Sequence, residues 1–261
     1  MNRNQIKEWL LDGDISIHYQ VYRDLLGQDN QQLRSEIHKR GWTSLLLKVQ
    51  NSDGHWGNGY YQPKWTSTHY TLLQLRNLWV QPEIPEIQNT IQKILVEEKG
   101  KDGGFNCQSN RKGAVHSSLH STISVLEGMR EYYRSGYKYR IDEVLNSEKE
   151  GQEFILQHRL YKSDKTGKVI KDSFLRFPYP HYWYYDILRA LDYFRYADVS
   201  LDTRMTAALN LLLAKRKKKG YWVLNARYPG REHFSMETPG KPSRWNTLRA
   251  LRVLEAYELI T

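Results

Sequence analysis

The chain has 261 residues and a formal net charge of +10, from 39 Lys and Arg against 29 Asp and Glu. Its 39% hydrophobic residues, with 19 Tyr and 8 Trp, exclude a disordered chain because they can fill a core. The single cysteine, Cys107, excludes an internal disulfide framework. No apolar run reaches the ~18 residues that span a bilayer, and the first residues lack an apolar signal segment, so we expect a cytoplasmic protein.

The positive charge is densest in the run Lys215–Lys219, directly before Gly220. Such a run could bind nucleic acid, but cations also stabilise the C-terminal end of a helix, where the helix dipole is negative. We favour the helix end and expect no nucleic-acid partner. The net charge instead favours a small anionic ligand by long-range attraction.

In chain order, the sequence predicts paired helices separated by glycine turns. Residues 4–27 form a short hairpin, broken at Asp12-Gly13-Asp14 and ended by Gly27. A sheet is not expected, because β-rich runs such as residues 221–224 are short and isolated. Further helices are predicted at 30–50, 66–79, 84–98, 115–134, 141–160, 181–196, 201–216 and 243–259.

The turns recur about every fifty residues, which is the range of repeat architectures built from helical hairpins. They are marked by Gly54, Gly103, Gly167 and Gly220. The predicted fold is therefore all-α, with five hairpins in one domain over 1–261. Residues 1–29 form a degenerate first hairpin, and residues 30–261 form four repeats.

Several strings carry a family resemblance. LKVQNSDGHWG and KDGGF, followed by helices rich in Leu, resemble the terpenoid cyclase and protein prenyltransferase superfamily of α/α toroids. FPYPHYWYYDILRALDYF and PSRWNTLRALRVLEAY resemble its uncharacterised, squalene-cyclase-like bacterial members. The resemblance implies a ring of inner helices inside a ring of outer helices. Toroids of this superfamily usually have about six hairpins, so five leave closure of the ring open.

The activities of that superfamily do not transfer simply. Its class II cyclases protonate an alkene with an Asp-x-Asp-Asp acid, and the nearest string here, Asp198 to Asp202, has another spacing and suits a helix N-cap. Its prenyltransferases hold zinc with Asp, Cys and His. Here Cys107 lies in a loop and Ala114 stands at the expected Asp position, so two ligands are missing.

Aligning the predicted inner helices on Leu75, Leu126, Leu191 and Leu254 gives an apolar stripe that we assign to the core. Beside it, His69, His116 and His120 fall in neighbouring tiers at the mouth of the ring. Three readings stay open for these histidines: a zinc site, a metal-free ligand pocket, or structural residues. No cofactor is required by the sequence.

Aromatic and basic residues gather in the connectors and first helical turns at the same mouth. Rings there could stabilise a cation or stack on a sugar, and arginines could receive an anionic group. The candidate catalytic residues are His69, His120, Tyr185 and Asp186. The candidate ligand pocket comprises Trp65, His69, His116, His120, His181, Tyr182, Trp183, Tyr185, Arg189, Arg244, Trp245 and Arg249.

Two nearby pairs, Arg189 with Asp192 and Arg252 with Glu255, are spaced to satisfy each other within one helix. For the whole chain, we expect a toroid that binds an isoprenoid-like or other anionic amphipathic ligand without class II acid chemistry. A carbohydrate-active α/α barrel, of lyase or hydrolase type, and a non-catalytic helical-repeat module are the alternatives. The sequence does not decide whether the protein is an enzyme.

Overall fold

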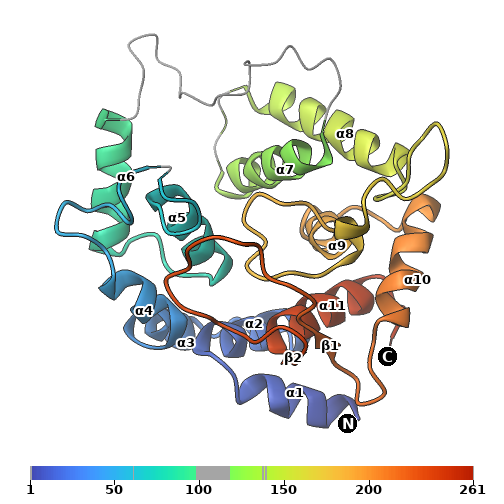
Figure 1. Cartoon of the computed structure of the whole chain (residues 1–261), viewed down its shortest axis with the longest axis horizontal. Coiled ribbons are helices and arrows are strands. Elements are labelled where there is room, and N and C mark those ends of the chain that lie inside the picture. Colours follow the sequence, from blue (N-terminus) through green and yellow to red (C-terminus); the bar gives the residue numbers. More distant parts are fainter. Residues whose placement is uncertain (1, 61, 98–117, 137, 139, 261) are drawn as a thin grey trace. The chain divides into compact units, whose positions relative to one another are not determined.

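The computed structural model describes residues 2–60, 62–97, 118–136, 138 and 140–260 (Figure 1). This part of the chain is mostly helical, and its only sheet is one pair of two-residue strands, which confirms the all-α class. Within these ranges no helix is both long and apolar enough to cross a membrane. The expectations for Gly103, Cys107, Ala114 and His116 lie outside the described residues.

The chain forms two compact units. Unit 1 comprises Met1–Ala114 together with Tyr228–Thr238, and unit 2 comprises Val115–Arg227 together with Pro239–Thr261. The short segment 228–238 thus packs with the first half of the chain although both its neighbours belong to unit 2. The single-domain expectation stays a prediction, and each unit is described by itself.

The described helices of unit 1 agree with the predicted order but not with all boundaries. The predicted helix 30–50 is wrong as one element, because Gly41 has φ +69° and Arg40 is extended. Asp14 fixes this break, since its Oδ2 accepts a hydrogen bond from the Trp42 backbone N–H at 2.7 Å. The elements are α1 (Arg3–Leu11), α2 (Ile15–Leu25), α3 (Gln31–Glu36), η1 (Ile37–Lys39), α4 (Gly41–Lys48), α5 (Thr68–Asn77) and α6 (Pro85–Glu97).

In unit 2, α9 starts later than predicted. The sequence predicted a helix from 181, but Tyr182 has φ +49°, which an α-helix does not accept, and Asp186 provides the N-cap. The elements are α7 (Leu119–Arg134), α8 (Ile141–Gln157), η3 (Asp172–Leu175), α9 (Ile187–Tyr196), η4 (Thr203–Met205), α10 (Thr206–Ala214), β1 (Trp222–Val223), β2 (Pro242–Ser243) and α11 (Arg244–Ala256).

Two further expectations meet a clear outcome in unit 2. The run that begins at Lys215 follows the last residue of α10, as predicted, with Lys215 itself as C-cap. The expectation of no sheet is wrong in detail, because β1 and β2 pair antiparallel at the base of the connector 224–241. Two more backbone hydrogen bonds continue the pairing into the connector. The Leu224 N–H donates to the Lys241 carbonyl, and the Gly240 N–H donates to the Leu224 carbonyl.

The glycine turns carry a specific set of hydrogen bonds. After Gly54, at φ +85°, the buried Trp56 donates its indole N–H to the Leu46 carbonyl at 2.7 Å, which closes the end of α4. The Trp56 backbone N–H donates to Thr68 Oγ1 at 3.0 Å, and that hydroxyl donates back to the Trp56 carbonyl at 3.4 Å. One tryptophan therefore joins the end of α4 to the start of α5.

The same three hydrogen bonds occur in unit 2. After Gly220, at φ +92°, Trp222 donates its indole N–H to the Leu212 carbonyl at 2.8 Å. Its backbone N–H donates to Thr247 Oγ1 at 3.0 Å, and the hydroxyl donates back at 3.5 Å. Both tryptophans lie ten residues after their carbonyl partner, so the two turns share one design.

The predicted apolar stripe is confirmed as core. Leu75, Leu126, Leu191 and Leu254 are all buried. In unit 2, α7 contacts α9 and α9 contacts α11, so these predicted inner helices are neighbours. Gly151 lets α8 approach α7 closely, because a Cβ there would meet the Leu126 side chain at 2.7 Å.

Candidate functional site

The predicted site residues divide between the two units. Trp65 and His69 belong to unit 1, His120 and the later residues belong to unit 2, and His116 lies outside the described residues. The zinc site of these three histidines therefore stays a prediction. Within the described ranges, no group of three or more His, Cys, Asp or Glu is arranged to hold a metal ion.

Most of the candidate pocket residues in unit 2 are buried by packing. Some of their polar atoms are used by internal hydrogen bonds, as in Tyr185, whose hydroxyl donates to the Leu160 carbonyl at 2.6 Å. Burial, with Arg189 and Arg249 nearby, holds the pKa of His181 well below its ordinary value. These side chains shape the interior and do not line an open surface. The buried members are His181, Tyr182, Tyr185, Arg189, Trp245 and Arg249.

A partly exposed group of rings remains, and we name His120, Phe174, Trp183 and Tyr184 the aromatic cluster. The His120 ring lies 5.0 Å from Trp183, 5.3 Å from Phe174 and 5.6 Å from Tyr184, between centroids. Trp183 and Tyr184 stack on each other at 4.5 Å. His120, Trp183 and Tyr184 are half-buried, so their rings reach the surface of unit 2.

The protonation state of His120 follows from its contacts. Its Nδ1 lies 2.8 Å from the Tyr185 backbone N–H, which can only donate, so Nδ1 accepts and the neutral ring carries its hydrogen on Nε2. Burial, followed by the charges of Lys171 and Arg189, lowers the pKa of His120 to about 4. At neutral pH His120 is thus an uncharged N–H donor, and neither nitrogen offers a free lone pair to a metal.

Asp186 is the most perturbed carboxyl group near the cluster. Its Oδ1 accepts the Arg189 backbone N–H at 2.9 Å, whereas its buried Oδ2 has no hydrogen-bond partner among the described residues. Burial raises the pKa of Asp186 to about 6, opposed by the charge of Arg249. Asp186 can therefore hold a proton near neutrality, which suits an acid or base.

The predicted pairing of Arg189 with Asp192 is wrong. Arg189 turns to α7 and holds Glu127 with two hydrogen bonds, at 2.9 and 2.6 Å. Asp192 instead receives Arg252 through two hydrogen bonds and Arg249 at 3.3 Å. Burial alone would raise the pKa of Asp192, but these arginines hold it well below its ordinary range. Packing between helices supplies Arg252 and Arg249, whereas Arg195, three residues along α9, also pairs with Asp192 at 3.2 Å.

In unit 1, Trp65 and His69 lie at the start of α5. Trp65, at φ +73°, precedes the helix, and its ring meets Tyr70 edge-on at 4.9 Å. His69 contacts Tyr70 at 5.0 Å and Tyr60 at 5.6 Å. Burial lowers the pKa of His69, so this ring is neutral at pH 7.

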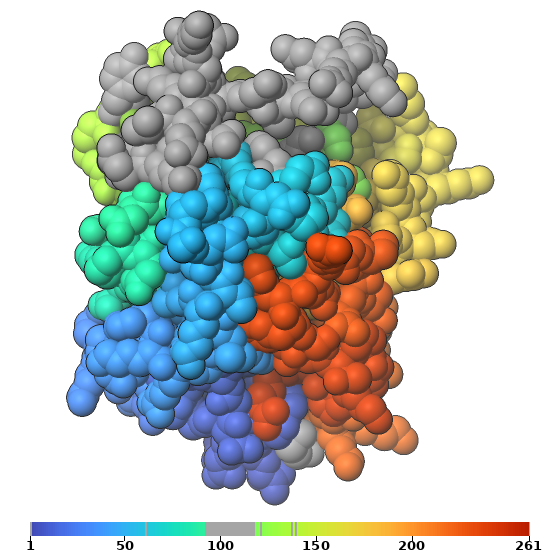
Figure 2. Space-filling view, turned by 60° about the vertical axis from the view of Figure 1, so that its left-hand side comes forward, coloured from blue at the N-terminus to red at the C-terminus, as the bar shows by residue number. Residues whose placement is uncertain are grey.

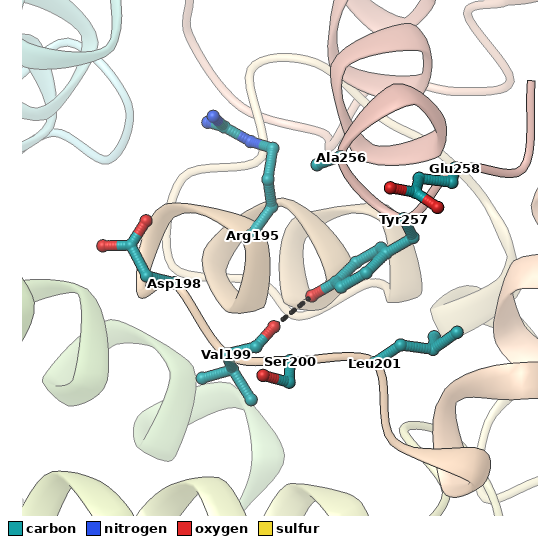
Figure 3. Close-up of a pocket in the computed structure, with 8 residues that line it drawn as sticks. All are labelled: Arg195, Asp198, Val199, Ser200, Leu201, Ala256, Tyr257 and Glu258. Carbon is teal, nitrogen blue, oxygen red and sulfur yellow. Dashed lines mark hydrogen bonds between the residues drawn. The ribbon is translucent and has the colours of Figure 1, made fainter. Parts of the chain in front are cut away.

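A groove of about 450 Å³ lies elsewhere in unit 2, at the C-terminal ends of α9 and α11 (Figure 3). Across it the Tyr257 hydroxyl donates to the Val199 carbonyl at 3.2 Å. None of the sequence-predicted site residues lines it. The lining residues are Arg195, Asp198, Val199, Ser200, Leu201, Ala256, Tyr257 and Glu258.

Sequence reasoning missed two members of the aromatic cluster and its neighbouring cation. Tyr184 was not singled out because a helical period was applied to residues 181–186, which are not helical, and Phe174 lies before that predicted helix. The Lys171 ammonium lies 6.0 Å from the centre of the Phe174 ring, and its charge helps to lower the pKa of His120. The aromatic density of the run before Asp186 was the available signal. Searches of protein-family models, curated proteins and solved structures find no match to this chain.

Proposed function

We propose that the protein binds a small anionic, amphipathic ligand at the aromatic cluster of unit 2. The observation that carries the proposal is the group of half-buried rings around a neutral His120. Trp183 and Tyr184 offer apolar area at low entropic cost, and aromatic rings bind the apolar part of a ligand well. His120 Nε2–H supplies a donor, and the exposed Lys171 supplies a positive charge for an anionic group.

We keep the α/α toroid, its kinship with the terpenoid cyclase and prenyltransferase superfamily and the cytoplasmic location as parts of this proposal. The shared hydrogen bonds of Trp56 and Trp222 support a repeated hairpin. The contacts of α7 with α9 and of α9 with α11 support a row of inner helices. Solution scattering that fits an elongated rod would contradict the ring.

A thermal-shift assay tests the ligand site. The intact protein is titrated with farnesyl diphosphate, dodecanoate and an acidic oligosaccharide. We expect at least one to raise the melting temperature, and Trp183→Ala to weaken that ligand about tenfold, in line with the ~1.4 kcal/mol that corresponds to a factor of ten. Lys171→Ala should weaken the same ligand, because it removes the neighbouring charge.

Tyr133→Ala is the matched control. Tyr133 is an exposed aromatic residue of α7 outside the aromatic cluster, and its loss should leave binding unchanged. If none of the three compounds stabilises the protein, or if Trp183→Ala binds as well as the wild type, the proposal fails. The non-catalytic repeat module would then be the better reading.

A further inference from the structure

The connector between β1 and β2 contains an unusual segment, residues 228–238, which we name the strap. It spans part of an 18-residue connection, 224–241, and connections of that length are uncommon unless they serve a function. Its tip packs in unit 1, against the start of α5. Figure 1 shows this orange-red loop beside α5, and Figure 2 shows its atoms against the cyan surface of unit 1.

The strap's attachments to the rest of unit 1 include two hydrogen bonds. Trp65 donates its indole N–H to the Pro229 carbonyl at 2.6 Å. Thr71 Oγ1 lies 2.9 Å from His233 Nε2 and itself donates to the Ser67 carbonyl, so the imidazole N–H is the donor to Thr71. In each hydrogen bond the two partners lie more than 160 residues apart in sequence. Tertiary folding therefore brings the strap to this position.

The strap lies on the Trp65 ring without any side chain between them. A Cβ on Gly230 would come 2.2 Å from Trp65 Nε1, so only glycine allows this contact. No residue of the strap is buried, whereas beneath it Trp65 is 2% exposed and Thr71 is 0% exposed. Segments outside the core open more readily than the core itself, so the strap covers a closed surface without being part of the core.

The covered surface has the chemistry of a binding site. Trp65 offers an N–H donor and an apolar ring set at 77° to Tyr70. Ser67 is fully buried, and its Oγ has no hydrogen-bond partner among the described residues. The Pro229 carbonyl accepts a hydrogen bond on this surface as a ligand's oxygen would. The backbone of Gly230, which has no side chain, lies on the Trp65 ring as a flat apolar part of a ligand would.

We propose that the strap is a lid over a second ligand site, in which the Trp65 indole N–H and the Ser67 hydroxyl hold a carboxylate or carbonyl oxygen of an apolar molecule. In the closed state the Pro229 carbonyl takes the place of that oxygen. The strap and the ligand compete for Trp65, so the apparent affinity is the intrinsic affinity multiplied by the fraction of molecules in which the strap is open. This site is separate from the aromatic cluster.

The test uses Gly230→Ala in the intact chain, with Gly240→Ala as matched control. Both glycines have positive φ in the same connector, but a Cβ on Gly240 meets no atom within 4 Å. Trypsin cleavage after the exposed Arg231 measures opening, and 11-(dansylamino)undecanoate, a fluorescent fatty acid, is the binding probe. We expect Gly230→Ala to speed cleavage and to bind the probe about fivefold or more tightly, as a larger open fraction requires.

His233→Ala removes one attachment without adding strain and should also speed cleavage and tighten binding. Adding Trp65→Phe to Gly230→Ala should abolish the gain, because it removes the indole donor. Adding Trp183→Ala should leave the gain intact, which separates this site from the aromatic cluster. Faster cleavage without tighter binding, an equal effect of Gly240→Ala, or a gain that survives Trp65→Phe would overturn the proposal.

Discussion

Asp186 shows how one buried residue sets a local proton balance. It caps α9 through Oδ1, so the fold needs its oxygen but not its charge. Its pKa of about 6 exceeds the ordinary value of 3.8 because burial disfavours the ionised form. The folded state thus binds the proton more tightly than the unfolded chain. Stability from this group is complete below about pH 4 and declines as pH rises through about 6.

Asp186→Asn should remove that decline, because Asn can accept the Arg189 N–H but cannot ionise. Relative to wild type, the variant should gain on the order of 3 kcal/mol in free energy of unfolding between pH 4 and pH 8, from a shift of about two units. Urea unfolding at several pH values measures this. Asp202→Asn is the control, since Arg204 lowers the pKa of that N-cap and the trend should reverse. Parallel curves for Asp186→Asn and wild type would refute the expectation.

His120 should remain neutral through the physiological range. The Tyr185 backbone N–H fixes the hydrogen on Nε2, and the pKa lies at about 4. We expect ¹⁵N NMR of the ring, assigned against His120→Gln, to show the Nε2–H form between pH 5 and 8. Zinc should not shift its signals. A titration midpoint near 6.5 or the opposite tautomer would contradict this assignment.

At the scale of elements, a buried ion pair joins α7 and α8. Glu148 is 1% exposed and accepts two hydrogen bonds from Arg130, both at 2.9 Å. The Tyr193 hydroxyl of α9 donates to the same carboxylate at 2.6 Å. Three helices of unit 2 therefore meet at one side chain.

Glu148→Ala should destabilise the protein by roughly 3–5 kcal/mol, because Arg130 would keep a buried charge without its partner. Denaturant unfolding measures the loss. Glu143→Ala is the matched control, since its pair with Arg140 on the same helix is exposed and exposed pairs contribute little. Equal effects of the two substitutions would show that the pair at Glu148 is not a joint between helices.

For the molecule as a whole, five partly or fully buried histidines among the described residues have a pKa below the ordinary value. Burial is the largest cause of the lowered pKa in every one of them, and a base with a lowered folded pKa gives stability that is complete above about 6.5 and lost as pH falls. They are His18, His69, His120, His181 and His233.

We therefore expect the melting temperature to fall as pH is lowered from 7 to 5. Asp186 opposes this trend, but it is one group against five. Differential scanning calorimetry in buffers of constant ionic strength measures the change. His181→Phe, which cannot be protonated, should flatten the curve. A melting temperature that is constant or rises towards pH 5 would contradict the expectation.

The sequence alone determined the helical class, the glycine turns and the core stripe. Each depends on neighbours within a few turns: Leu191 and Leu254 show the helical period, and Gly54 and Gly220 adopt the positive φ expected of turn glycines. Lys215 at the end of α10 was also predictable, because a helix end favours cations. The sequence predicted that the candidate site is aromatic, but it did not predict which aromatic residues form it.

Only the tertiary structure decided which distant residues meet. Arg189 pairs with Glu127, 62 positions away, and not with Asp192 on its own helix. The start of α9 depends on the conformation of Tyr182, and the strap on the contact of Gly230 with Trp65. Periodicity assigns a residue to one face of its own helix. Its partner is the side chain that packing brings to that face, and the spacing of residues in the sequence does not identify that side chain.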